Sequence, residues 1–368
     1  MSIPKTIKTW QMTKPWIKDP KTGDVQPGEI KKTEIPVPDL KPGEVLVEVA
    51  GCGVCHTDLG YFFDGVPTVV KPPLTLGHEI SGKVVAGDEK WLGKEVIIPA
   101  VMPCRQCWIC KTGRGNRCLD QKMPGNSIGI YGGFSSHIPV PSIDLCEVKN
   151  RGDVPLEHLA VVADAGTTPY QAAKRASLGP GDNVVVIGAA GGVGSYMTQV
   201  AAALGASNVV GIDIDDERLK RALQHGASDV INSRGKAAKD VQEEWKQIMK
   251  KRGAPSYGWK IFEATGSAPG QEIGLSLLSF VGKLIVIGYG MAKSQYMISR
   301  LMAFDAEIIG TWGCLPEHYP VVLDMVLKGK IKITPFLETR PMSTIVETFN
   351  EIHEKGSPAR RVVLTPDF

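Results

Sequence analysis

Cysteine, histidine and acidic side chains are concentrated between residues 51 and 79 of the sequence. The segments Gly-Cys-Gly-Val-Cys-His-Thr-Asp and Gly-His-Glu bring thiols, imidazoles and carboxylates into this short window. A catalytic zinc ion binds about three such side chains and keeps a further position open for water or substrate. We therefore interpret Cys55 and His78 as the first two ligands of a catalytic metal. The alternative is a buried turn with a free cysteine, because unliganded cysteine is often buried.

A second group of cysteines follows with the spacing C-x2-C-x2-C-x7-C. Its members are Cys104, Cys107, Cys110 and Cys118. Four thiolates so placed can close a tetrahedral shell around zinc and stabilise a lobe that has little core of its own. An iron–sulfur cluster also uses closely spaced cysteines, but the long last gap and the lack of a proline after it are atypical of bacterial ferredoxins. The array predicts a structural zinc site in a lobe of about residues 103–119.

A glycine-rich loop follows the apolar run at residues 184–187, with the sequence Gly-Ala-Ala-Gly-Gly-Val-Gly. Glycines allow a tight turn and a close approach of the backbone to phosphate, and the helix expected through residue 203 offers N–H donors at its first turn. Ala189 stands where the G-x-G-x-x-G pattern has its first glycine, a departure that leaves the phosphate cradle in place. The candidate pyrophosphate contacts are Gly188, Gly191, Gly192, Val193 and Gly194.

Asp213 ends the next predicted strand, roughly 20 residues beyond the glycine loop, where an acidic residue binds the ribose hydroxyls of NAD. Its charge and those of Asp215, Asp216 and Glu217 would repel the additional phosphate of NADP. The alternative is that Asp213 is an ordinary turn residue. The pattern as a whole predicts NAD as the coenzyme.

The elements that must position these residues differ between two regions. Alternating apolar residues at 45–50 and short runs at 80–85, 95–98 and 134–140 predict an irregular β domain. Residues 14–28, rich in proline, glycine and lysine, are predicted to be a surface loop. Beyond residue 166 the strand-like runs alternate with helices, which predicts a doubly wound parallel sheet. The strand-like runs are 184–187, 209–212, 229–231, 260–262, 284–287 and 307–309, and the helices between them include 217–225 and 237–252. Near the C-terminus, a helix at 342–355 and a strand at 361–364 are predicted to return to the first domain.

Length and composition indicate a globular protein of two domains. The chain has 368 residues, of which 43% are hydrophobic and 22% charged, and single cores stop growing at ~250–300 residues. A formal net charge of +3 gives no broad basic field, so we expect no nucleic acid and no membrane as partner. The basic residues at 246–252 are expected to form the solvated face of a helix. The start lacks a secretory signal and no run approaches the ~18 apolar residues of a membrane span, so we expect a cytoplasmic protein.

The Gly-His-Glu segment, the four-cysteine array and the nucleotide loop together resemble the zinc-dependent medium-chain alcohol dehydrogenases over nearly the whole chain. The resemblance implies an α/β fold with a GroES-like, β-rich catalytic domain at residues 1–165 and 311–368. It implies a Rossmann NAD-binding domain at residues 166–310, with the active site in the cleft. It also implies two zinc ions per subunit, one catalytic and one structural, and a homo-oligomer, with a tetramer favoured over a dimer.

The resemblance further assigns roles around the catalytic metal. Asp164 matches the third zinc ligand, where many relatives have cysteine, and a carboxylate oxygen is an acceptable ligand. Glu79 matches a carboxylate that approaches the metal during ligand exchange, and Asp58 matches a partner of the ligand histidine. Thr57 matches the hydroxyl that contacts the substrate oxygen and begins a proton relay. Relatives often have histidine at the position of Gly60, so proton release must use water or another group.

The same resemblance implies that His56 and Arg361 contact the coenzyme pyrophosphate and that Thr168 lies against the nicotinamide. Over its full length the chain also resembles members that oxidise a ring alcohol of an alicyclic acyl-CoA in the anaerobic breakdown of benzoyl-CoA. This implies a secondary alcohol as the small-molecule substrate and a ketone as the product. Two alternatives are a zinc-free quinone or enoyl reductase, which generally lacks the four-cysteine lobe, and a catalytically silent NAD-binding protein.

Overall fold

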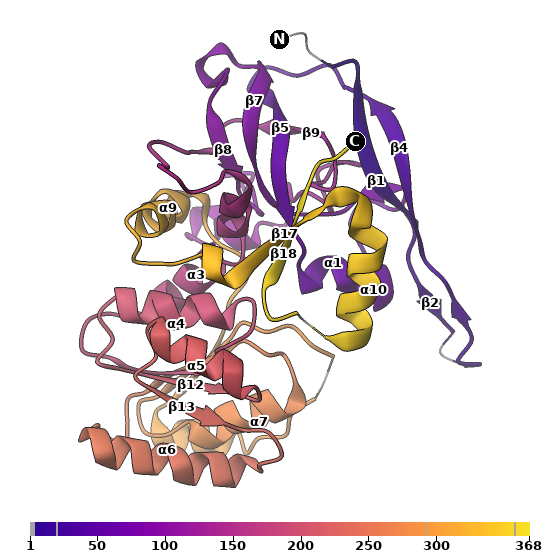
Figure 1. Ribbon diagram of the computed structural model, residues 1–368. Coiled ribbons are helices and arrows are strands. Elements are labelled where there is room, and N and C mark those ends of the chain that lie inside the picture. The colour runs from indigo at the N-terminus through magenta and orange to yellow at the C-terminus, as the bar shows by residue number, and fades with distance from the viewer. Residues whose placement is uncertain (1–3, 20, 292, 357) are drawn as a thin grey trace. The chain divides into compact units, whose positions relative to one another are not determined.

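The computed structural model describes residues 4–19, 21–291, 293–356 and 358–368 (Figure 1). The chain divides into two compact units. Unit 1 consists of Met1–Thr167, Gly313–Leu327 and Ile333–Phe368, and unit 2 of Thr168–Trp312 and Lys328–Lys332. The short return to unit 2 is held by the side chain of Gln199, because the Lys332 N–H donates to its Oε1 at 2.7 Å and its Nε2 donates to the Lys332 carbonyl at 3.1 Å.

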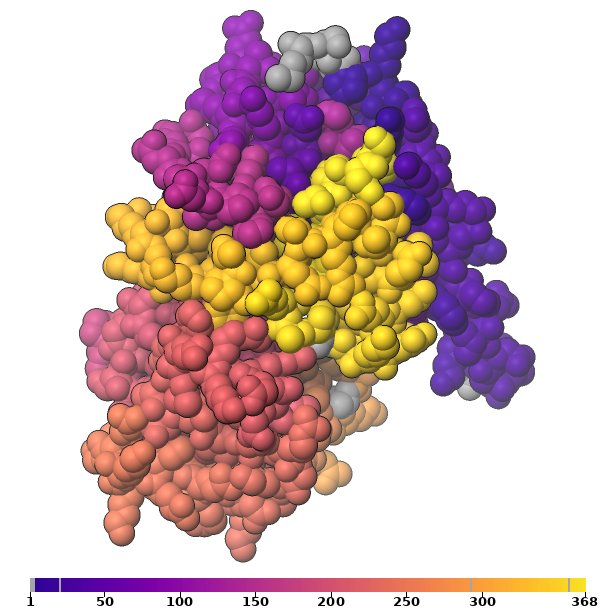
Figure 2. Space-filling view, in the orientation of Figure 1, coloured from indigo at the N-terminus to yellow at the C-terminus, as the bar shows by residue number. Residues whose placement is uncertain are grey.

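The main sheet of unit 1 has the strand order β10-β8-β7-β5-β18-β17, and β9 also pairs with β5. Its strands are β5 (Glu44–Gly53), β7 (Glu79–Gly87), β8 (Glu95–Ile98), β9 (His137–Pro141), β10 (Cys146–Glu147), β17 (Leu337–Pro341) and β18 (Arg361–Thr365). The C-terminal strand β18 pairs antiparallel with β5, and Figure 1 shows its yellow ribbon beside the indigo one. Within unit 1, the yellow C-terminal atoms adjoin the purple β-rich part in Figure 2. The predicted closing strand is therefore confirmed.

The predicted surface loop at residues 14–28 contains two short strands, so that prediction was wrong in part. They are β2 (Ile17–Lys18) and β3 (Val25–Gln26), which pair antiparallel. The turn between them is closed by Asp19, whose Oδ1 accepts the N–H groups of Lys21 and Thr22. Two residues per strand are too few to show a period of two, which is why the pattern gave no strand signal. A separate sheet has the order β4-β1-β6, with β1 (Thr6–Lys14), β4 (Glu29–Pro36) and β6 (Leu74–Thr75).

The helices of unit 1 are short. They are α1 (His56–Phe63), α2 (Trp108–Lys111), α9 (Tyr319–Leu327) and α10 (Ile345–Lys355), with 3-10 helices η1 (Glu89–Trp91), η2 (Gly115–Arg117), η3 (Glu157–Ala163), η4 (Pro316–His318), η5 (Thr334–Phe336) and η6 (Met342–Thr344). Helix α1 begins immediately after Cys55, because the Asp58 side chain accepts the Cys55 N–H at 3.1 Å. This capping fixes the position of Cys55 between the end of β5 and the start of α1.

Unit 2 contains a parallel six-stranded sheet with the order β13-β12-β11-β14-β15-β16, which confirms the predicted doubly wound fold. Its strands are β11 (Asn183–Ile187), β12 (Asn208–Asp213), β13 (Asp229–Asn232), β14 (Lys260–Glu263), β15 (Lys283–Val286) and β16 (Glu307–Gly310). The helices are α3 (Thr167–Ala176), α4 (Gly194–Ala203), α5 (Asp216–Gln224), α6 (Ala238–Arg252), α7 (Ala268–Leu277) and α8 (Ser299–Phe304). The central strand β11 has four buried apolar residues, as expected where helices cover both faces of a sheet.

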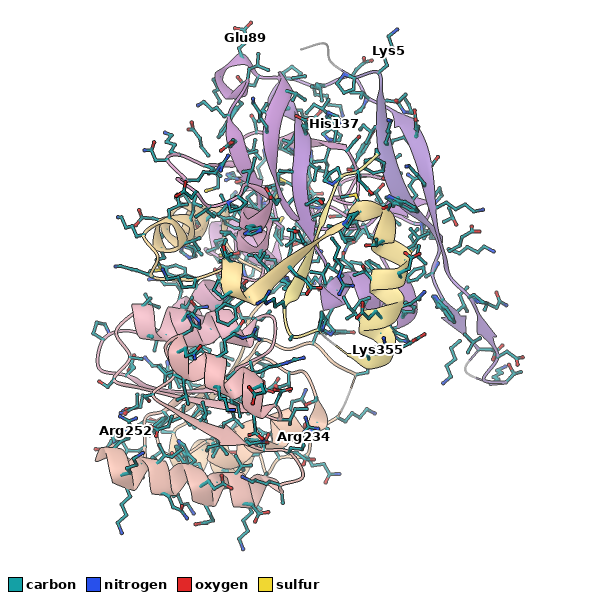
Figure 3. All side chains as sticks on the ribbon, viewed as in Figure 1. Lys5, Glu89, His137, Arg234, Arg252 and Lys355 are labelled. Atoms are coloured by element: carbon teal, nitrogen blue, oxygen red, sulfur yellow. The ribbon has the colours of Figure 1, made fainter. Side chains whose placement is uncertain are left out.

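The basic residues of α6 pair locally, which supports the solvated-face interpretation. Lys246 pairs with Glu243 on the same helix, and Arg252, labelled in Figure 3, pairs with Asp229 at the start of β13. The helix ends at Gly253, whose φ of 61° is in the left-handed region that glycine favours at a helix end. Among the described helices, none is both long enough and apolar enough to span a bilayer.

Candidate active site

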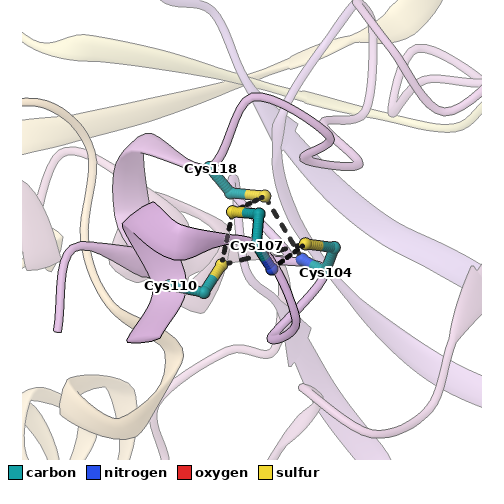
Figure 4. Close-up of side chains that lie close together, drawn as sticks. All are labelled: Cys104, Cys107, Cys110 and Cys118. Atoms are coloured by element: carbon teal, nitrogen blue, oxygen red, sulfur yellow. Dashed lines mark hydrogen bonds between the residues drawn. The ribbon is translucent and has the colours of Figure 1, made fainter. Parts of the chain in front are cut away.

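The four cysteines of the second array converge in the lobe around α2 (Figure 4). The Sγ atom of Cys107 lies 3.5 Å from that of Cys110 and 3.8 Å from that of Cys118, and the Cys104 and Cys110 sulfurs are 3.9 Å apart. Zinc–sulfur bonds of ~2.3 Å in tetrahedral geometry require sulfur separations of about 3.8 Å. The four donors therefore fit a zinc ion.

Ionisation of this array also requires a cation. Backbone N–H donors, first that of Cys107, lower the pKa of Cys104 to about 6, whereas desolvation raises the pKa of Cys110 to about 12. Four thiolates within 4.8 Å of one another would repel strongly, so protons remain on some of them unless a metal ion supplies compensating charge. The backbone donors and the sulfur spacing are thus suited to a closed tetrathiolate site.

The first group of candidate ligands also converges, all within unit 1. The donor atoms of Cys55, His78, Glu79 and Asp164 lie within 4.8 Å of one another. The Oδ2 atom of Asp164 is 3.9 Å from the Sγ atom of Cys55 and 3.6 Å from the Nε2 atom of His78. Zinc bonds of ~2.0–2.3 Å need donor separations of about 3.3–3.8 Å, so a thiol, an imidazole and a carboxylate are placed as a catalytic zinc ion requires.

Asp58 orients the two N-terminal donors. Its carboxylate is fully buried and accepts three hydrogen bonds, from the Cys55 N–H at 3.1 Å, from the Gly77 N–H at 3.1 Å and from Nδ1 of His78 at 3.2 Å. The Nε2 atom of His78 is thereby directed toward Cys55 and Asp164. Desolvation alone would lower the pKa of His78, but Asp58 and Asp164 outweigh it and raise this pKa well above its usual value. The position of Nε2 consequently favours a cation, either a proton or a metal ion.

Glu79 is engaged by Arg361 from the C-terminal strand. Arg361 Nε donates to Glu79 Oε2 at 2.8 Å, and its terminal nitrogen donates to the other carboxylate oxygen. The Glu79 side chain is fully buried and that of Arg361 is 7% exposed. Burial raises the pKa of Glu79, while the guanidinium of Arg361 opposes that shift. The pair places one positive charge beside a site with several acidic groups.

The nucleotide loop connects β11 to α4 in unit 2. Gly188 has a φ of +78°, and a Cβ atom at Gly194 would lie 1.9 Å from the Gly188 carbonyl oxygen. Only glycine satisfies both conditions, so the tight turn depends on these two residues. Asp213, at the end of β12, faces this loop, because its Oδ2 atom accepts the Ala190 N–H at 2.9 Å. The candidate ribose ligand and the candidate phosphate cradle therefore lie side by side.

Comparisons with known proteins identify the family. Residues 41–150 match the alcohol dehydrogenase GroES-like domain and residues 192–328 match the zinc-binding dehydrogenase family. The NAD-dependent alcohol dehydrogenase of Sulfolobus acidocaldarius is 32% identical over 353 residues, which cover 91% of this chain and 96% of that protein. This chain belongs to the zinc-binding alcohol dehydrogenase family.

Two further members illustrate the range of the family. Sorbitol dehydrogenase of Bombyx mori is 26% identical over 325 residues, covering 85% of this chain and 88% of that protein. The solved structure of acetophenone reductase from Geotrichum candidum, in complex with NAD, aligns with a TM-score of 0.81 at 26% identity and covers 99% of this chain and 98% of that one. A GroES-like domain combined with a Rossmann-like sheet is thus the fold of this dehydrogenase, as the sequence predicted.

The remaining candidate residues of the dehydrogenase lie in the following places. Thr57 is in the first turn of α1, with its Oγ1 atom 3.7 Å from Cys55 Sγ. His56 opens the same helix, and desolvation, reinforced by Arg361, lowers its pKa. Thr168 is in the first turn of α3. The coenzyme contacts of His56, Thr168 and Arg361 stay predictions, and the direct partner of Arg361 in this structure is Glu79.

Sequence reasoning missed two contributions to the site. One is the pairing of Arg361 with Glu79, since the two residues are 282 positions apart. The other is Tyr319 in α9, whose hydroxyl contacts the backbone next to Asp164. No spacing or period in the sequence signals either contact, because each depends on packing between distant segments.

Replacing Cys107 with serine is expected to lower the melting temperature and to release one zinc ion per subunit, because a tetrathiolate shell loses one of its four ligands. Metal content and thermal unfolding would be measured on soluble protein. The variant Cys146→Ser is a matched control, since Cys146 is a buried free cysteine outside the array. Normal stability of Cys107→Ser, with a specific loss of turnover, would contradict a structural role.

Proposed function

We propose that this protein oxidises a secondary ring alcohol to the corresponding ketone, with NAD as the hydride acceptor. Cys55, His78 and Asp164 would hold a catalytic zinc ion, and the four-cysteine lobe would hold a second, structural one. The observation that carries the proposal is the convergence of these three donors at 3.6–3.9 Å beside the hydroxyl of Thr57. In this assignment residues 1–165 and 311–368 form the catalytic domain and residues 166–310 the NAD-binding domain.

Different residues of the chain have different roles in the reaction. When bound, zinc supplies Lewis acidity that lowers the pKa of an alcohol, and NAD accepts the hydride from the carbinol carbon. Thr57 receives the hydroxyl proton of the substrate at Oγ1, and Asp58 keeps His78 in the required orientation. Arg361 offsets the negative charge of Glu79. The products are a ketone, NADH and one proton.

The proton leaves the site by a route that lacks the histidine found in many relatives. Gly60, at the corresponding position of α1, offers no side chain that could carry the proton onward. Water or the ribose hydroxyls of the coenzyme would therefore receive the proton from Thr57. Glu79 would approach the metal only if its pairing with Arg361 loosened, because both of its carboxylate oxygens accept from the guanidinium.

For the substrate, we infer 6-hydroxycyclohex-1-ene-1-carbonyl-CoA, oxidised to 6-oxocyclohex-1-ene-1-carbonyl-CoA in anaerobic benzoyl-CoA degradation. The proposal rests on the sequence resemblance described above, in particular on the 14–28 segment, Asp164 and Gly60. The CoA portion supplies binding energy remote from the reacting carbon, which can orient a small ring. Lysine and arginine side chains would bind its phosphates.

The substrate assignment is tested by measuring NAD reduction with the hydroxycyclohexenoyl-CoA thioester beside cyclohexenol, cyclohexanol, ethanol and sorbitol. We expect kcat/KM for the thioester to exceed that for each free alcohol by at least about 100-fold, because the free alcohols lack the CoA handle. Comparable specificity constants for a simple alcohol would contradict the acyl-CoA substrate and leave the zinc dehydrogenase activity intact.

Asp213 is expected to determine the choice between NAD and NADP. Its carboxylate faces the nucleotide loop, and Asp215 and Asp216 follow it. Asp213→Gly should reduce the preference for NAD over NADP by at least about tenfold, because a like charge near the additional phosphate is removed. Initial rates with both coenzymes would measure this ratio, and the rate with NAD reports any general damage. An unchanged ratio would refute the assignment.

A homo-oligomer, with a tetramer favoured over a dimer, is part of the proposal. Strand β16 is at the edge of the unit 2 sheet, and the large apolar side chains of Met297, Ile298 and Met302 near it are exposed. An exposed edge strand can pair with the same strand of a second copy, and burial of such side chains would stabilise the contact. A cytoplasmic location is supported by the cysteines, all eight of which lie in the described ranges and are free thiols.

A further inference from the structure

Tyr319, the first residue of α9, connects two distant parts of the unit 1 backbone. Its side chain is fully buried. Its hydroxyl accepts the Ala100 N–H at 3.0 Å and donates to the carbonyl oxygen of Ala163. Ala100 follows β8, and Ala163 is the last residue of η3. A single phenolic oxygen thus links the end of a sheet strand to the end of a 3-10 helix.

The carbonyl that Tyr319 holds belongs to the residue immediately before Asp164. The same carbonyl accepts from the Oγ1 atom of Thr167 at 3.4 Å, and this hydroxyl also lies 3.4 Å from the carbonyl oxygen of Asp164. Terminal carbonyls of a helix lack partners within the helix, so side-chain donors determine where the chain goes next. Tyr319 and Thr167 therefore fix the peptide from which the Asp164 side chain projects.

The hydroxyl of Tyr319 remains a donor throughout the physiological pH range. Burial raises the pKa of Tyr319 well above its usual value. A protonated phenol can donate to Ala163 and accept from Ala100 at the same time.

We propose that Tyr319 is a positioning residue for the catalytic metal, because it holds Ala163 and thereby places the carboxylate of Asp164 opposite Cys55 and His78. Cys55 and His78 are both oriented by Asp58, but Asp164 follows η3 and is 109 positions from Cys55. Ligands must be held to within about 0.5 Å of the productive geometry, so the peptide before Asp164 needs its own anchor. This inference rests on the proposed function, since it requires metal binding by these three residues.

The test is Tyr319→Phe, which removes the hydroxyl and keeps the ring. Loss of a partner that orients a metal ligand typically weakens metal binding by about 10–100-fold. In competition with a chelator, the catalytic zinc ion of the variant should therefore bind at least about tenfold more weakly than that of the wild type. With cobalt in place of zinc, the visible spectrum of that site should shift. The control is Tyr196→Phe, another fully buried tyrosine, in α4 of unit 2, which should leave both readouts unchanged.

A second variant tests the same inference if Tyr319→Phe does not fold. Thr167→Val removes the other hydroxyl that donates to the Ala163 carbonyl, so it should also weaken the binding of the catalytic zinc ion. In the double variant Tyr319→Phe and Thr167→Val, the two losses of zinc affinity should be non-additive. Tyr319→Phe protein that releases both zinc ions at wild-type rates, with an unchanged cobalt spectrum, would overturn the inference alone. A wild-type protein that carries only the structural zinc would overturn the proposed function and this inference together.

Discussion

Replacing Asp164 with alanine is expected to remove one zinc ion per subunit and to reduce turnover by at least about 1,000-fold. Asp164 supplies the carboxylate that completes the donor set with Cys55 and His78, at 3.9 and 3.6 Å from their donor atoms. Two remaining ligands hold zinc poorly, and loss of Lewis acidity removes several kcal/mol of stabilisation from the transition state. Zinc content and initial rates of NAD reduction would be measured on the same preparation.

Two variants make this result specific. Asp164→Cys should retain the second zinc ion, because a thiolate is an equally acceptable ligand at this position. Asp153→Ala, which changes an exposed aspartate of unit 1, should retain both zinc ions and normal rates. If Asp164→Ala kept both metals and normal turnover, Asp164 would not be a ligand of the catalytic zinc.

Replacing Arg361 with methionine is expected to destabilise the protein by about 3–5 kcal/mol, because a fully buried Glu79 carboxylate would lose its cationic partner. The pair joins β18 to the start of β7, so the C-terminal strand would be held less firmly in the sheet. Denaturant unfolding at fixed zinc concentration would measure the change.

The double variant Arg361→Met and Glu79→Gln provides the control, because it removes the charge that the single variant leaves unpaired. It should recover a large part of the lost stability. A loss below about 1 kcal/mol in the single variant would show that Glu79 becomes protonated or solvated at little cost, and the pair would then have no structural importance.

The features that the sequence determined are those that short segments specify. The six strands of unit 2 were located because each contains a short, largely apolar run and these runs alternate with helical segments. The nucleotide turn follows from glycines that no other residue can replace, at Gly188 and Gly194. The four cysteines of the lobe lie within 15 residues, so their spacing alone restricts them to one site.

Only the tertiary structure decided which distant residues meet. Asp164 reaches Cys55 across 109 positions, Arg361 reaches Glu79 across 282, and Tyr319 reaches Ala163 across 156. In the sequence Asp164 was identified by resemblance to a family, and the partners of Arg361 and Tyr319 were not identified at all. Contacts at such separations depend on how whole sheets and helices pack, and the free-energy cost of closing the chain between them is nearly independent of local residue pattern.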